Sequence, residues 1–97
     1  MRSIPSFKLV AEPLDAEAAQ VPPFKWAGAE VGKRHRLGGR PESLEPEAFP
    51  VCSCRKPMTF YGQLDSINDE FVLADCGLIY VFVCFDCFET KSILHSS

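Results

Sequence analysis

Four of the five cysteines form two close pairs whose spacing suits a metal site. The pairs are Cys52-Ser53-Cys54 and Cys84-Phe85-Asp86-Cys87, set thirty residues apart. Structural zinc takes four ligands in a tetrahedron, with thiolate sulfur about 2.3 Å from the ion. Each pair supplies half of that tetrahedron, and strand pairing can bring the halves together. The sequence predicts a closed structural zinc site, without an open position for chemistry, whose ligands are Cys52, Cys54, Cys84 and Cys87.

The two pairs match common zinc spacing unequally. The second pair has the common gap of two residues, whereas the single residue inside the first pair restricts how its sulfurs converge on one ion. Neither pair is followed by the glycine that usually relieves such a turn, because Arg55 and Phe88 stand there.

Three alternatives to this ligand set stay open. All five cysteines could be reduced thiols without a function, since free cysteine behaves as a small hydrophobe. Another residue could replace Cys52 as a ligand, and the candidates are Cys76, His95 and His35. Redox cycling of Cys84 and Cys87 is the third alternative. It needs a helix N-terminus that lowers the thiol pKa, whereas the residues after Cys87 resemble a strand.

Composition indicates one small globular domain over residues 1–97. The chain is 46 % hydrophobic, with eight Phe, and carries a net charge of −3, which argues against general affinity for nucleic acid or anionic membrane. Residues 1–50 hold most of the Pro and Gly and form a loop-rich N-terminal half. The side chains that we expect to dock this half on the rest are Phe7, Leu9, Phe24 and Trp26. No apolar run has the length of a signal peptide or membrane span, so we expect a cytoplasmic protein, in which disulfides are rare.

The apolar pattern of the C-terminal half predicts strands. Residues 58–64 alternate as one strand, 71–74 form a short second strand, and 88–94 a more polar outer strand. Residues 78–84 are apolar on both faces, which indicates a central strand covered on both sides. The N-terminal half adds a short strand within 4–10 and a short helix within 14–21. We predict an α+β fold: a small antiparallel β-sheet of about four strands with a zinc-ribbon-like cysteine site.

A basic cluster beside Gly38-Gly39 is the main candidate for binding. Its members are Lys33, Arg34, Arg36 and Arg40. Guanidinium groups and glycine amides both suit an anion, although in an acidic chain a solvated loop is the simpler interpretation. An enzyme would need a nucleophile and a base, and Cys76 with His35 or His95 is the only cysteine–histidine combination outside the metal site. Nothing in the spacing brings these together, so we expect no catalysis.

Four segments, in this order, carry a resemblance to a known family. Residues 35–41 (HRLGGRP) look like a K-[IL]-G-G-x-P loop and residues 50–58 (PVCSCRKPM) like a P-x-C-P-x-C-G-x-P-M turn. Residues 60–65 (FYGQLD) look like an F-[LI]-x-Q-[IL]-D strand, and residues 75–87 (DCGLIYVFVCFDC) look like D-x-G-x-x-Y-V-F-x-C-P-D-C. Over residues 33–90 the chain thus resembles the YwqG-like domains of unknown function. The resemblance implies a small α+β fold with a cysteine metal site and supplies no activity.

These features together predict a zinc-stabilised, non-catalytic module. Its expected partner is another protein, in the cytoplasm of a bacterium. The alternative is a nucleic-acid-binding zinc ribbon that uses the basic loop at 33–40, and a cysteine-based enzyme or redox protein is a further alternative.

Overall fold

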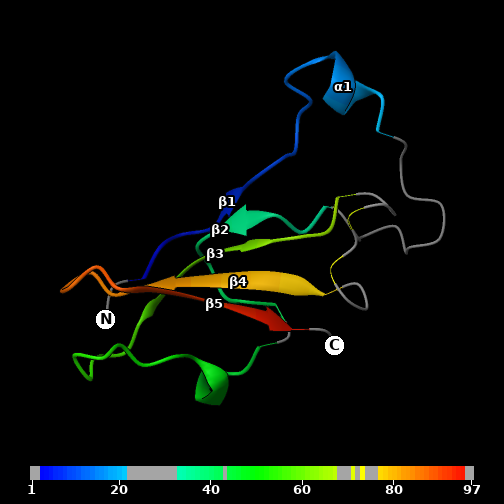
Figure 1. The fold of residues 1–97 in the computed structure, drawn as a ribbon. Coiled ribbons are helices and arrows are strands. Elements are labelled where there is room, and N and C mark those ends of the chain that lie inside the picture. Colours follow the sequence, from blue (N-terminus) through cyan, green and yellow to red (C-terminus); the bar gives the residue numbers. More distant parts are fainter. Residues whose placement is uncertain are drawn as a thin grey trace.

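The computed structural model describes residues 3–21, 33–42, 44–67, 71, 73 and 77–95 (Figure 1). Within these residues the chain forms a five-stranded antiparallel sheet in which the strand order follows the chain order. The strands are β1 (Phe7–Lys8), β2 (Arg36–Leu37), β3 (Thr59–Leu64), β4 (Leu78–Val83) and β5 (Thr90–His95). The antiparallel sheet predicted from the apolar pattern is confirmed. The strand expected at 71–74 lies largely outside the described residues.

Strand β4 has neighbours on both sides but is covered on one face only. Its residues alternate between fully buried and half-buried, with Leu78, Tyr80 and Phe82 buried. Ile79, Val81 and Val83 point to the opposite face and are only half-buried. The expectation of a doubly covered strand is therefore wrong for the part of the chain that the structure describes.

Helix contributes little to the described residues. The only α-helix among them, α1 (Ala16–Ala19), begins at Asp15, whose carboxylate accepts a 2.8 Å hydrogen bond from the Ala18 amide. None of its residues is buried, and Figure 1 shows it standing away from the sheet. A 3₁₀-helix, η1, spans Pro46–Ala48. The described structure is mostly sheet, so the α part of the predicted α+β class is not confirmed. Short helices are marginal unless they pack against other elements, and α1 has no packed face that could stabilise further turns.

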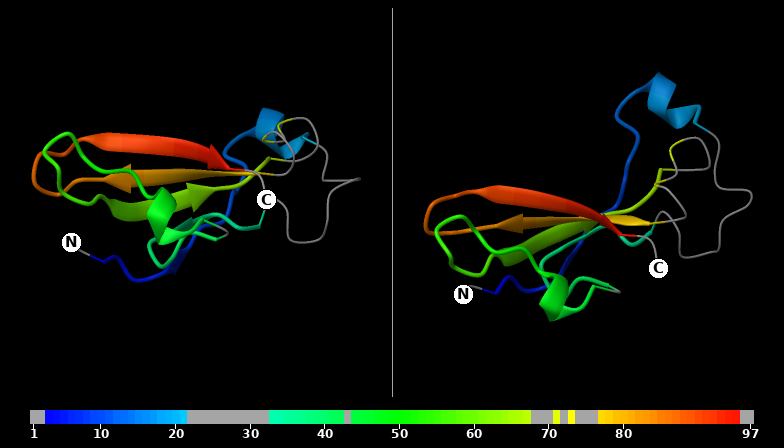
Figure 2. Two further views of the ribbon diagram at one scale, coloured as in Figure 1. Left: turned by 90° about the horizontal axis from the view of Figure 1, so that it is seen from below. Right: turned by 60° about the horizontal axis from the view of Figure 1, so that its bottom comes forward.

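The core lies on one face of the sheet, under the segment that contains η1. The rings of Phe60, Tyr80 and Phe82 pack together, with the centroids of Phe60 and Phe82 5.7 Å apart. Leu44 is buried against them, and the Phe49 ring lies 5.1 Å from that of Phe82. Figure 2 shows the η1 segment lying against this face.

Of the expected docking side chains, Phe7 does not pack on the core. Phe7 is 55 % exposed and Leu9 is half-buried, whereas Phe24 and Trp26 lie outside the described residues. The error has a physical cause: Phe7 belongs to a two-residue strand at the sheet edge, where its ring meets solvent.

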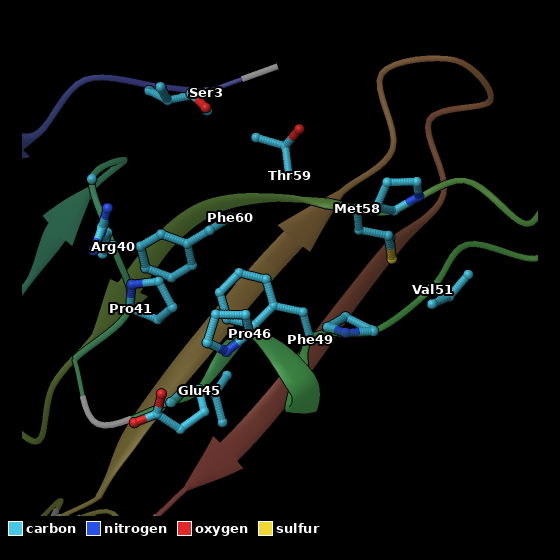
Figure 3. A pocket seen from close by; sticks show the side chains of 15 residues that line it. Ser3, Arg40, Pro41, Glu45, Pro46, Phe49, Val51, Met58, Thr59 and Phe60 are labelled. Carbon is cyan, nitrogen blue, oxygen red and sulfur yellow. The ribbon is translucent and has the colours of Figure 1, made fainter. Parts of the chain in front are cut away.

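The covering segment leaves an apolar groove of about 640 Å³ along the start of β3. Figure 3 shows its walls: Pro41, Pro46 and Phe49 come from the covering segment, and Met58 and Phe60 from the sheet side. The cover over the core is thus incomplete on this side.

Candidate metal centre

Antiparallel pairing places both cysteine turns at the same end of the sheet. Strand β3 begins at Thr59, soon after the first cysteine pair, and β4 ends at Val83, directly before the second pair. Thr59 and Val83 are cross-strand partners. Figure 2 shows the two turns, in green and orange, side by side at this end in both views.

The four sulfurs lie close enough to bind one ion. The Sγ atoms of Cys52, Cys54, Cys84 and Cys87 all lie within 4.8 Å of one another. Cys52 Sγ is 3.0 Å from Cys87 Sγ, and Cys54 Sγ is 3.7 Å from Cys84 Sγ. A tetrahedron with 2.3 Å metal–sulfur bonds has edges of about 3.8 Å. The two measured separations lie at or below that value and no pair exceeds 4.8 Å, so the four cysteines are positioned to bind a metal ion.

The two turns close with the same pair of backbone hydrogen bonds despite their different lengths. In the first turn the Arg55 amide donates to the carbonyl of Cys52 (2.8 Å), and the Cys52 amide donates to the carbonyl of Lys56 (3.0 Å). In the second turn the Phe88 amide donates to the carbonyl of Cys84 (2.8 Å), and the Cys84 amide donates to that of Glu89 (2.9 Å). The first turn is the second turn shortened by one residue. The single-residue gap therefore does not prevent the sulfurs from converging.

Both turns place a large residue in the left-handed region of backbone space. Arg55 has φ 70° and Phe88 has φ 63°, and these are the two positions where the sequence lacks the expected glycine. A side chain other than glycine in this conformation costs about 1–2 kcal/mol. The structure keeps the turn geometry at this cost, so other interactions at the site must offset it.

Backbone amides tune the thiols. The amide N–H of Cys87, followed by that of Asp86, lowers the pKa of Cys84 to about 7. The hydrogen bond with the Cys87 thiol raises the pKa of Cys52. Cys52 and Cys84 are buried among core residues, whereas Cys54 and Cys87 are exposed. The centre thus joins the core on one side and faces solvent on the other.

Polar contacts also join the two turns, and no residue pattern indicated them. The Glu89 carboxylate accepts hydrogen bonds from the Ser53 amide (3.2 Å) and from the Ser53 hydroxyl, and the hydroxyl contact lowers the pKa of Glu89. Lys91 Nζ donates to the carbonyl of Val51 (2.9 Å). These partners are distant in sequence, and the β3–β4 and β4–β5 pairings bring them to the same end of the sheet.

Neither histidine lies with the thiols. His95 pairs with Leu78 at the far end of β5, about 17 Å along the strand from Thr90. His35 Nδ1 accepts a 3.0 Å hydrogen bond from the Asp65 amide, just past the far end of β3. The metal-ligating group found among the described residues contains the four cysteines and no histidine. His35 and His95 therefore do not replace Cys52, and Cys76 lies outside the described residues.

The second turn lacks the helix that the redox alternative needs. The chain passes from the turn after Cys84 into β5 at Thr90. The helix N-terminus that such a dithiol motif needs is absent at this place.

The basic loop is tied into the sheet, and its glycine amides are already occupied. The Gly38 amide donates to the carbonyl of Tyr61 (2.8 Å), and the Gly39 amide donates to that of Ile4 (2.7 Å). A Cβ on Gly38 would lie 2.1 Å from the Pro5 carbonyl oxygen, so the close approach requires glycine. The idea that these amides bind an anion is wrong. Arg34 forms a two-pronged pair with Asp65, at 2.8 Å for each hydrogen bond.

Gln63 connects the loop to β3. This side chain is 2 % exposed. Its Oε1 accepts hydrogen bonds from Arg36 Nη2 and from the Glu42 amide, both at 3.1 Å, and its Nε2 donates to the carbonyl of Arg34 (2.8 Å). Sequence reasoning assigned Gln63 only to a strand face. The available signal was a glutamine among the apolar residues of a strand. If its amide is buried, it needs several hydrogen-bond partners from neighbouring segments.

Comparisons with protein-family models, with curated proteins and with solved structures find no match for this chain. None of the helices in the described ranges is long and apolar enough to cross a membrane.

Proposed function

We propose that the four cysteines hold one structural zinc ion in a non-catalytic module that binds another protein. The observation that carries the metal is the grouping of four thiols within 4.8 Å on two matched turns. Four thiolates are typical of structural zinc, and soft sulfur ligands select against hard ions such as magnesium. All four positions would be filled by the protein, so no position is left for a substrate.

Metal content tests the zinc assignment directly. Protein purified without added metal is expected to carry close to one equivalent of zinc by elemental analysis. Cys84→Ser should lose most of it, because a buried ligand is removed. Cys76→Ser is the matched control and should retain the full equivalent. Folded wild-type protein with metal content near zero would contradict the proposal, and iron in place of zinc would correct the identity of the ion.

The uncovered face of the sheet supports the protein partner. The β3–β4–β5 register aligns Leu64, Ile79 and Leu94 across this face, and Leu64 and Leu94 are 45 % and 53 % exposed. Val81 and Val83 continue the face, and its β5 positions are otherwise Thr90 and Ser92. We call these residues of β3, β4 and β5 the open face. A contiguous apolar surface without charged side chains is typical of an interaction site.

Site-specific photo-crosslinking tests the open face. A photoreactive residue at Leu64 or Leu94 is expected to give a defined protein adduct in cells. The same residue at Glu17, an exposed position of α1, should not give that adduct. Equal labelling from all three positions would contradict a partner at the open face.

The rival function is a nucleic-acid-binding zinc ribbon that uses the loop at 33–40. Oligonucleotide titrations at two salt concentrations separate the two functions. Micromolar binding with a steep negative salt slope, abolished by replacing Lys33, Arg34, Arg36 and Arg40, would favour the rival. Arg34 complicates this test because it also stabilises the fold through Asp65, so loss of binding must also appear in the variant that retains Arg34. We further propose that the chain is a short YwqG-like relative with a cytoplasmic location.

A further inference from the structure

We propose that a basic hollow beside the β1–β2 pair binds a small phosphate-bearing anion. The hollow has a volume of about 720 Å³. Five cationic side chains line it: Lys8 of β1 and, from the basic loop, Lys33, Arg34, Arg36 and Arg40. The proposal is independent of the zinc site, which lies at the opposite end of β3.

The charge in this hollow is unbalanced. Lys8 and Arg36 are direct cross-strand partners, and like charges placed opposite each other destabilise a strand pair. Asp65 neutralises Arg34, which leaves four cationic side chains against the single carboxylate of Glu42. A chain with a net charge of −3 thus gathers four cations around one concave surface. A bound dianion would turn this repulsion into attraction.

His35 provides the second observation. It lines the same hollow and is 9 % exposed. Its Nδ1 accepts the Asp65 amide, so in the neutral ring the proton sits on Nε2. That Nε2–H is buried and has no hydrogen-bond partner among the described residues. Burying a donor without an acceptor is unfavourable, and this atom has almost no exposed surface, so a ligand oxygen would reach it only after the ring or its neighbours move.

The donors around the hollow suit phosphate in particular. Arginine presents several N–H donors in a rigid fork that matches the oxygens of phosphate. Among the described residues, Nη2 of Arg36 is hydrogen-bonded to Gln63 and to the Arg40 carbonyl, and the guanidinium carbon lies 6.0 Å from the centre of the Phe60 ring, which leaves its other N–H groups as candidate donors to a ligand. Ser6 adds a hydroxyl at the rim. The four cations gather around a single hollow, which would suit one inorganic phosphate group or phosphate monoester.

Titration with pyrophosphate at low salt, followed by NMR, tests the site on the full chain. We expect saturable shifts of the Arg36 and Arg40 resonances and a change in the His35 Nε2–H signal. Lys8→Gln combined with Arg40→Gln should weaken binding at least about tenfold, because charge-assisted hydrogen bonds are lost. Both residues are exposed, so the fold should persist. Lys8→Gln alone should also weaken binding, whereas Lys56→Gln, which likewise removes one positive charge, should leave binding unchanged.

Parallel titrations distinguish the sources of the phosphate. Inorganic phosphate and a nucleoside monophosphate should compete for the same site. Equal weakening by Lys56→Gln would reduce the effect to general charge and overturn the proposal, as would the absence of saturable binding. A single-stranded oligonucleotide whose affinity grows with its length, while pyrophosphate fails to compete, would overturn it in favour of a nucleic-acid surface. None of these titrations depends on the measured zinc content, so failure of the anion proposal is distinguishable from failure of the zinc proposal.

Discussion

Chelation of the zinc ion that we propose at the four cysteines is expected to unfold this protein rather than loosen one end of it. Structural zinc sites contribute about 10–16 kcal/mol of apparent binding free energy in small peptides, whereas a whole domain is stable by only about 5–15 kcal/mol. The described core is thin, with eight buried hydrophobic residues on one face of the sheet. The strained residues Arg55 and Phe88 add a cost that coordination would offset. Far-UV circular dichroism during titration with a strong chelator measures the loss of structure.

Two cysteine variants provide the control for chelation. Cys84→Ser should lower the melting temperature far more than Cys76→Ser, because Cys84 belongs to the group of four thiols found among the described residues. Equal effects would mean that the ligand set is wrong. A chelated protein that retained its strand signal and melting temperature would show that the Ser53–Glu89 and Lys91–Val51 contacts suffice to hold the turns.

Removing the charge of Asp65 is the second change that we expect to lower the stability of the fold strongly. The Asp65 side chain is fully buried, and its oxygens accept hydrogen bonds from the Arg34 side chain, the Arg34 amide (3.0 Å) and the Ser66 amide (2.7 Å). Breaking a buried ion pair by removing one partner costs about 3–5 kcal/mol. Since Arg34 retains 19 % exposure, Asp65→Asn should lose about 3 kcal/mol, at the lower end of that range.

Urea unfolding measures this loss, and a second ion pair provides the control. Asp86 pairs with Lys56 at 3.2 Å, and both side chains are more than half exposed. Asp86→Asn should therefore cost less than about 1 kcal/mol. If the two variants were equally stable, the Arg34–Asp65 pair would contribute no more than a surface contact, and the loop at 33–42 would not depend on it.

The three long strands could be predicted because each carries an apolar period over several residues. The proximity of the two cysteine pairs could also be predicted, because each pair stands at the end of a predicted strand. Strand β1 lies within the short strand predicted at 4–10, whereas β2 could not be predicted from the residue pattern, because two residues carry no period. Their pairing depends on Gly38 and Gly39 packing against residues 4–6, and these contacts are distant in sequence.

Whether a second layer covers both faces of β4 could not be predicted from the sequence, for a different reason. Ile79, Val81 and Val83 would look the same under a second layer as they do on an open face, since composition does not distinguish a core position from an interaction surface. Likewise, the gap of one residue between Cys52 and Cys54 looked unfavourable for a zinc site. Spacing rules count the residues between two ligands and say nothing of the hydrogen bonds that shape the turn. What the turns share is a hydrogen-bond pattern, and that pattern tolerates the loss of one residue.

The position of both cysteine turns at one end of the β3–β4 pair has a consequence for how such centres diversify. The chain leaves the thiols at Thr59 and returns to them at Val83, so the connection between the strands lies at the opposite end of the sheet. Residues inserted or deleted in that connection would not change the separation of the sulfurs. The thirty-residue interval between the cysteine pairs is then free to drift during evolution. Related centres are better recognised by the two local turns than by the number of residues between them.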